Sequence, residues 1–156
     1  MARLNLHGTC VALGTDAVLL RGEPGAGKSD LGLRFLALPP EGGPQPKLIA
    51  DDQVWIERGG GGELFASAPD AIAGKIEVRG LGIVAVPYLA QGRLVLVVDL
   101  VSDQEVPRMA PDPPEIVTIA GVAVPRLVLA PFEASAPLKL KLALLQAASP
   151  QRSEQG

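Results

Sequence analysis

The feature that most constrains this chain is a glycine-rich segment of eight residues, Gly22 to Ser29, which reads GEPGAGKS. It matches the pattern GxxxxGK[ST], in which glycines allow backbone N–H groups to converge on phosphate oxygens. The pattern is informative here because an apolar stretch, residues 17–20, precedes it and an apolar-rich stretch, residues 30–38, follows it. The context predicts a phosphate loop between a strand and a helix. The residues expected to bind a nucleotide's phosphates are Gly22, Glu23, Pro24, Gly25, Ala26, Gly27, Lys28 and Ser29.

Two side chains of this loop carry specific expectations. Lys28 is expected to neutralise the β- and γ-phosphate oxygens, while the helix that begins beside it adds the positive end of its dipole. The hydroxyl of Ser29 is expected to hold Mg²⁺. A phosphate loop alone indicates only that a nucleotide binds, so the chemistry depends on other residues.

The rest of the chain predicts more strands than helices. With 18 Gly and 15 Pro among 156 residues, the core must consist of short elements joined by many turns. Helices are expected at 30–38, 69–76 and 137–147, and loops at 39–46 and 101–114. Strands are expected at 4–13, 17–20, 48–50, 54–57, 64–67, 83–88, 93–100, 115–119 and 122–129. The prediction is one α/β domain, residues 1–148, with a strand-rich mixed sheet, few short helices and a frayed tail at 149–156.

Composition excludes several classes of function. Fourteen Lys and Arg against seventeen Asp and Glu give a net charge of −3 without a basic run, so nucleic acid is not an expected partner. The single cysteine, Cys10, cannot form an internal disulfide or a cysteine-rich zinc site. No apolar stretch approaches the roughly 20 residues that span a bilayer, and the first residues do not resemble a signal peptide. These features predict a cytoplasmic protein without a membrane partner.

An acidic pair, Asp51 and Asp52, is expected at the end of the strand 48–50. Successive side chains of a strand point to opposite faces, so the two carboxylates should have different roles. One could accept a proton from an attacking hydroxyl while the other orients Mg²⁺ or the phosphate loop. A solvated turn or a helix cap is the alternative reading of such a pair.

Three further residues invite a functional reading. Glu77 and Arg79 are two positions apart, so an extended backbone would direct an Mg²⁺-binding acid and a phosphate-binding cation to one side; a surface ion pair is the alternative. Asp99 ends an apolar run like a Walker B aspartate and offers a second Mg²⁺ site, although a strand-end turn residue is the simpler interpretation.

Taken in order, four segments resemble the catalytic, C-terminal domain of the HPr kinase/phosphorylase family. They are His7-Gly8, the loop ending in Gly27-Lys28-Ser29, the segment Ile49 to Asp52, and the acid-x-Arg-Gly-Leu-Gly segment that begins at Glu77. The last of these four segments is the one most specific to the family. The compact form, with the ending Pro131 to Pro137, looks like the short alphaproteobacterial members.

The resemblance implies a phosphate-loop kinase domain that uses ATP and Mg²⁺ to phosphorylate a serine of the small phosphocarrier protein HPr in phosphotransferase-system regulation. By position, it implies that Ser29 and Glu77 hold Mg²⁺ and that His7 joins the active site. One member of the Asp51-Asp52 pair would be the catalytic base, with Asp52 slightly favoured. Arg79 matches the family signature, and Arg108 matches an arginine on a loop near the transferred phosphate.

Other readings stay open at this point. The family's reverse reaction with inorganic phosphate is less supported, because residues 122–131 read VAVPRLVLAP and lack a recognisable dephosphorylation segment. The family forms hexamers, which leaves a homo-oligomer open. A phosphate-loop kinase of small molecules and a non-catalytic nucleotide-binding module are the alternative functions. The carboxylates of Asp51, Asp52 and Glu77 argue against the module.

Overall fold

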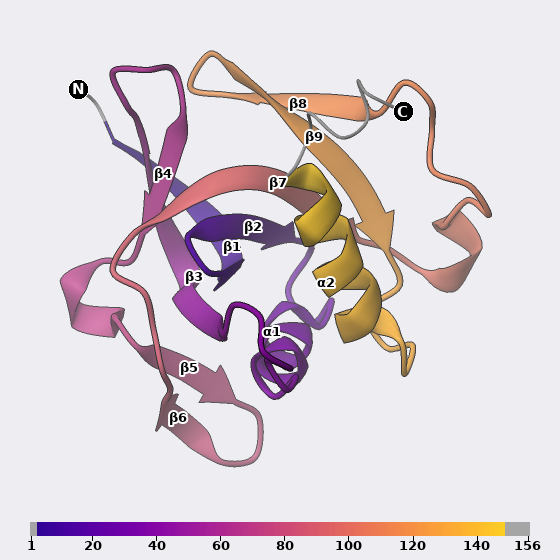
Figure 1. The fold of residues 1–156 in the computed structure, drawn as a ribbon. Helices are drawn as coiled ribbons and strands as arrows, with labels where there is room; N and C mark the ends of the chain where they lie inside the picture. Colours follow the sequence, from indigo (N-terminus) through magenta and orange to yellow (C-terminus); the bar gives the residue numbers. More distant parts are fainter. Residues whose placement is uncertain (1–2, 149–156) are drawn as a thin grey trace.

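The computed structural model describes residues 3–148, and its main element is a mixed sheet of seven strands in the order β2-β1-β3-β4-β7-β9-β8 (Figure 1). A two-stranded sheet, β5-β6, stands apart from it. The strands are β1 (Leu4–Leu13), β2 (Asp16–Arg21), β3 (Pro46–Arg58), β4 (Leu64–Ser67), β5 (Lys75–Val78), β6 (Gly82–Ala85), β7 (Gly92–Leu100), β8 (Glu115–Ile119) and β9 (Val122–Leu129). The helices are α1 (Lys28–Leu36) and α2 (Ala136–Ala147), with 3₁₀ turns η1 (Asp70–Ile72) and η2 (Asp103–Glu105).

Five strands of the large sheet close into a ring. β2 pairs with β1 on one side and, in parallel, with β7 on the other, so the hydrogen-bonded circuit runs β2-β1-β3-β4-β7 and returns to β2. One apolar cluster takes side chains from all five of these strands and from β8 and β9, but none from the helices. Its small members, such as Ala12, Ala17 and Ala50, allow the strands to approach one another inside the ring.

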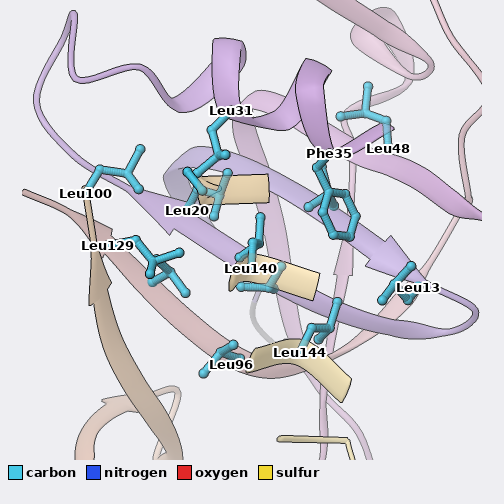
Figure 2. Close-up of a cluster of buried hydrophobic side chains, with 14 of the residues drawn as sticks. Leu13, Leu20, Leu31, Phe35, Leu48, Leu96, Leu100, Leu129, Leu140 and Leu144 are labelled. Carbon is cyan, nitrogen blue, oxygen red and sulfur yellow. The ribbon is translucent and has the colours of Figure 1, made fainter. Parts of the chain in front are cut away.

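A second apolar cluster joins the sheet to the two helices (Figure 2). Leu31 and Phe35, four residues apart on α1, are fully buried, as are Leu140 and Leu144 of α2. This spacing places each pair on one helix face. Burying each such side chain contributes roughly 1.5–3 kcal/mol. The cluster therefore fixes α1, and with it the loop that precedes the helix, against the sheet.

A glycine lets α1 approach the sheet closely. A Cβ on Gly32 would lie 3.1 Å from Cγ2 of Thr9 on β1, so a larger residue would push the helix away. The first turn of α1, which carries Ser29, is therefore held near the middle of β1. This close approach positions the candidate site.

Two predicted elements were wrong. The acidic pair does not end a strand, because β3 runs through it and pairs with β1 along its length, with Asp51 opposite Thr9 and Asp52 opposite Gly8. Residues 69–76 do not form a helix: the 3₁₀ turn η1 is followed by Gly74, with φ of 72°, and by strand β5. Ile76 is buried and pairs with Val84 of β6, so tertiary packing of this residue favours the strand.

Most of the other expected elements agree with the structure. The mixed, strand-rich α/β fold with few helices is confirmed, as are the first hairpin and the helices after the glycine loop and after Pro137. The predicted strand 83–88 ends at Ala85, and Tyr88 instead forms a bridge with Leu48. The tail at 149–156 lies outside the described residues. No helix within residues 3–148 is long and apolar enough to cross a membrane.

Candidate functional site

The glycine-rich segment forms the connection between β2 and α1, as predicted. Lys28 is buried, with 9% of the residue exposed, and its ammonium group donates hydrogen bonds to the carbonyl oxygens of Gly22 (2.7 Å) and Glu23 (3.1 Å). These bonds tie the end of the loop to its beginning. Because an ammonium group has three protons, one remains for an oxygen in the cavity.

Gly27 shapes the transition from loop to helix. It is the N-cap residue of α1, in the left-handed conformation (φ 97°, ψ 19°), and α1 has no side-chain cap. The first N–H groups of a helix lack intrahelical acceptors, and the helix dipole makes this end electropositive. An uncapped helix start beside a glycine loop and a lysine is well suited to bind phosphate oxygens.

Asp51 connects the phosphate loop to the sheet. Its side chain is buried, and Oδ1 accepts hydrogen bonds from Ser29 Oγ (2.8 Å) and from Thr9 Oγ1 (2.7 Å). Oδ2 accepts a longer bond from the backbone N–H of Glu77 (3.3 Å). One carboxylate therefore holds the last loop residue, strand β1 and strand β5 in fixed relation.

Asp52 has a different environment. Its φ of 77° is unusual for a residue other than glycine and interrupts the regular alternation of β3. Its side chain is 68% exposed, and Oδ1 lies 3.3 Å from Nδ1 of His7 on β1. The two adjacent carboxylates therefore differ in burial and in partners. The expectation that they have different roles stays a prediction.

A cavity of about 670 Å³ lies between the phosphate loop, α1 and the β5-β6 hairpin. Lys28 and Ser29 line it from one side, and Glu77 and Arg79 line it from the other. Of the predicted loop residues, Gly25 and Gly27 also line it, whereas Gly22, Glu23 and Ala26 line a neighbouring cavity of about 610 Å³. The larger cavity thus contains cations, helix N–H groups and a carboxylate, the groups that bind a metal-bound phosphate chain.

The donors in the cavity fit Mg²⁺. No group of three or more His, Cys, Asp or Glu side chains that could hold a metal occurs within residues 3–148. Mg²⁺ characteristically binds one or two protein oxygens and completes its shell with water and substrate phosphates. The hydroxyl of Ser29 and the carboxylate of Glu77, both at the cavity, are oxygen ligands of this kind.

Several sequence candidates do not line this cavity. His7, Asp51 and Asp52 are among them, and Asp51 is joined to the lining by its hydrogen bonds with Ser29 and Glu77. Arg108 is exposed in the loop between η2 and β8, apart from the described residues that line the cavity. Asp99 binds Arg21 (2.8 Å) and Arg126 (2.6 Å). Burial raises the pKa of Asp99, but its hydrogen bonds and charge interactions with the two arginines outweigh burial and lower the pKa below its ordinary value. Asp99 is therefore an ion-pair partner at the end of β7 rather than a free metal ligand.

Sequence reasoning missed two residues of the site. Thr9 holds Asp51, and the signal for it was its position two residues after His7 on one strand face. Phe132 also lines the cavity, although it follows the glycine loop by more than 100 residues. Phe132 lies in the ending Pro131 to Pro137, but nothing in that segment points to the phosphate loop, and it is Arg34 of α1 that holds the segment there.

Comparison with known proteins identifies relatives of this chain. The family model described as the HPr serine kinase C-terminal domain matches residues 1–131. An HPr kinase/phosphorylase of Caldicellulosiruptor bescii is 34% identical over 137 residues, which cover 81% of this chain and 42% of that protein. One of Clostridium tetani is 39% identical over 84 residues, 54% of this chain and 25% of that protein. The chain therefore spans less than half the length of these relatives.

A solved structure shares the fold. The HPr(Ser) kinase/phosphatase of Coxiella burnetii superposes with a TM-score of 0.76 at 24% sequence identity, covering 98% of this chain and 99% of that one. The mixed sheet with its two helices is thus a known arrangement.

Proposed function

The chain belongs to the HPr serine kinase C-terminal domain family, and we propose that it transfers the γ-phosphoryl group of ATP to a serine of an HPr-like phosphocarrier protein. The observation that carries the proposal is the direct link between the phosphate loop and the acidic pair, made by Ser29 and Asp51. This link supports the proposal because it joins the phosphate loop to β3, the strand that carries both aspartates.

In this proposal the nucleotide's phosphates lie on the N–H groups of the loop and of the first turn of α1. Lys28 contributes the remaining proton of its ammonium group, and Arg79 faces the same cavity from the β5-β6 hairpin. Both positive charges balance the charge that spreads over the transferring phosphoryl oxygens. Ser29 and Glu77 would hold Mg²⁺, which supplies further charge neutralisation when bound.

We assign the proton acceptor to Asp52 and a positioning role to Asp51. Asp51 is buried and already accepts hydrogen bonds at both oxygens, whereas Asp52 is exposed beside His7. The serine Oγ attacks the γ-phosphorus, its proton passes to Asp52, and the bond to the β,γ-bridging oxygen breaks to release ADP. His7 holds the Asp52 carboxylate toward the substrate.

The reverse direction follows from the same arrangement. Protonated Asp52 would return its proton to the serine oxygen when inorganic phosphate attacks phosphoserine, giving pyrophosphate. The names of the relatives, HPr kinase/phosphorylase, include both the forward and the reverse reaction. Because the substrate would be a phosphocarrier and ATP, we place the protein in the cytoplasm.

The test is transfer to a defined serine. The purified chain is incubated with Mg-ATP and the HPr-like protein of the same organism, and the product is analysed by intact mass and peptide mapping. A single phosphoserine supports the proposal. ATP consumption with a metabolite but not with the HPr-like protein would favour a small-molecule kinase, and nucleotide binding without transfer to either would favour a non-catalytic module.

A further inference from the structure

An aromatic ring stands exposed at the phosphate loop. Phe132, in the connection between β9 and α2, is 70% exposed. The ring packs on Gly27, since a Cβ on that glycine would lie 2.9 Å from Cζ of Phe132. The chain has five aromatic residues, and Phe132 is the one that lines the cavity described above. Single exposed apolar side chains are ordinary on protein surfaces, so the significance of Phe132 comes from its contact with the phosphate loop and from its place in the lining of the cavity.

The backbone on both sides of Phe132 is anchored to α1. The guanidinium group of Arg34 donates hydrogen bonds to the carbonyl oxygens of Pro131 and of Glu133, the latter at 3.3 Å. Asp30 holds the same guanidinium group (2.9 Å), and Lys139 of α2 pairs with the Glu133 carboxylate (3.0 Å). These contacts fix the segment, so the ring is held beside the loop before any ligand arrives.

Phe132 also lines the neighbouring cavity of about 610 Å³, which contains the start of the phosphate loop at Gly22 and Glu23. The ring therefore lies between the two cavities. A nucleotide whose terminal phosphate points toward Asp52 must direct its nucleoside away from the acidic pair. Among the residues that line this neighbouring cavity, Phe132 provides the aromatic face.

We propose that Phe132 is the platform on which the base of the nucleotide stacks, with Arg34 as the residue that positions it. The inference rests on the proposed function, which requires that a nucleotide binds the loop and that its terminal phosphate points toward Asp52. Stacking on an aromatic face gives affinity without reading the hydrogen-bonding edge of the base. The ring would thus add binding energy for a nucleoside triphosphate that a bare triphosphate cannot gain.

Calorimetric titration tests the proposal without any transfer reaction. The probes are Mg-ATP and magnesium tripolyphosphate, which lacks ribose and base. Phe132→Ala should weaken Mg-ATP binding about tenfold, as expected for one lost stacking contact, and should leave tripolyphosphate binding unchanged. Phe132→Trp should restore Mg-ATP affinity. Ile116→Ala, at a residue of similar exposure (63%) on β8, is the matched control and should change neither.

Two results would overturn the proposal. Unchanged Mg-ATP affinity in Phe132→Ala would show that the ring does not contact the base. An equal loss for both probes would show that the ring merely supports the loop. Neither result depends on phosphorylation of a protein, so a wild-type chain that binds Mg-ATP but fails to modify the HPr-like protein would contradict the proposed function and leave this test valid.

Discussion

Ser29 Oγ donates a 2.8 Å hydrogen bond to Oδ1 of Asp51, so the last residue of the phosphate loop is tied to the acidic pair on β3. The same oxygen of Asp51 also accepts a hydrogen bond from the hydroxyl of Thr9. In the proposed mechanism, this one buried carboxylate would couple nucleotide binding to proton transfer. The hydrogen bond joins the phosphate loop to β3, although Ser29 and Asp51 are more than 20 residues apart in the sequence.

The two aspartates should respond differently to substitution. Asp52→Asn should lower kcat about a hundredfold or more and leave nucleotide affinity nearly unchanged, because a general base acts in the transition state. Asp51→Asn should also disturb nucleotide affinity, because the amide changes the partners of Ser29. Steady-state kinetics and calorimetric binding measure both. An Asp52→Asn variant with wild-type kcat would contradict the assignment of the base.

Thr9 should act through Asp51. Thr9→Val keeps the shape of the side chain but removes a hydrogen bond to a charged acceptor, which typically contributes about 1.5–3 kcal/mol. We expect a lower free energy of unfolding and a several-fold fall in kcat, and Thr9→Ser should restore both. Thr118→Val, on exposed β8, is the control. A normal kcat in Thr9→Val would show that Asp51 does not need this bond for catalysis.

Most of the fold could be predicted from the sequence because most elements depend on patterns within a few neighbouring residues. The phosphate loop, the first hairpin and the helix after Pro137 each depend on turn residues and apolar spacing that can be read directly. Strand β3 was divided at Asp51-Asp52 because the polar pair looks like an end, whereas pairing with β1 carries the strand through it. Its positive φ at Asp52 has no sequence signal, since the residue is not glycine.

The site was predictable in part for the same reason. Lys28, Ser29, Glu77 and Arg79 belong to compact motifs, and the structure brings them to one cavity. Phe132 reaches the cavity through the packing of distant elements, which no short pattern records. Asp99 resembles a metal ligand in the sequence, whereas in the structure it pairs with Arg21 and Arg126 from two other strands.

The contact between Gly27 and Phe132 predicts unequal costs for two glycine substitutions. Gly25 and Gly27 both have positive φ, 83° and 97°, so an alanine at either costs about 1–2 kcal/mol. A Cβ at Gly27 would also clash with Phe132, while none of the surrounding atoms lies within 4 Å at Gly25. Urea unfolding should therefore show a larger loss for Gly27→Ala. The excess should disappear in the Phe132→Ala background, and an excess that persists would contradict this account.

Asp99 should make stability depend on pH in one direction. Its folded-state pKa lies below the unfolded-state value of about 3.9. The carboxylate therefore stabilises the fold above that value, and the contribution is lost as pH falls through the folded-state pKa. Asp99→Asn should lower the free energy of unfolding by about 1–3 kcal/mol at pH 7. The gap from wild type should narrow as the pH falls below the unfolded-state value, and a gap independent of pH would exclude this ion pair as its source.

The most direct test of the central claim is the rate of phosphoryl transfer from Mg-ATP to the serine of the HPr-like protein, compared between the wild-type chain and Lys28→Ala. We expect phosphoserine to accumulate with the wild-type chain and the rate to fall roughly a hundredfold or more in the variant, because Lys28 neutralises the charge of the transferring group. Transfer by Lys28→Ala at the wild-type rate would show that phosphorylation does not occur at this site.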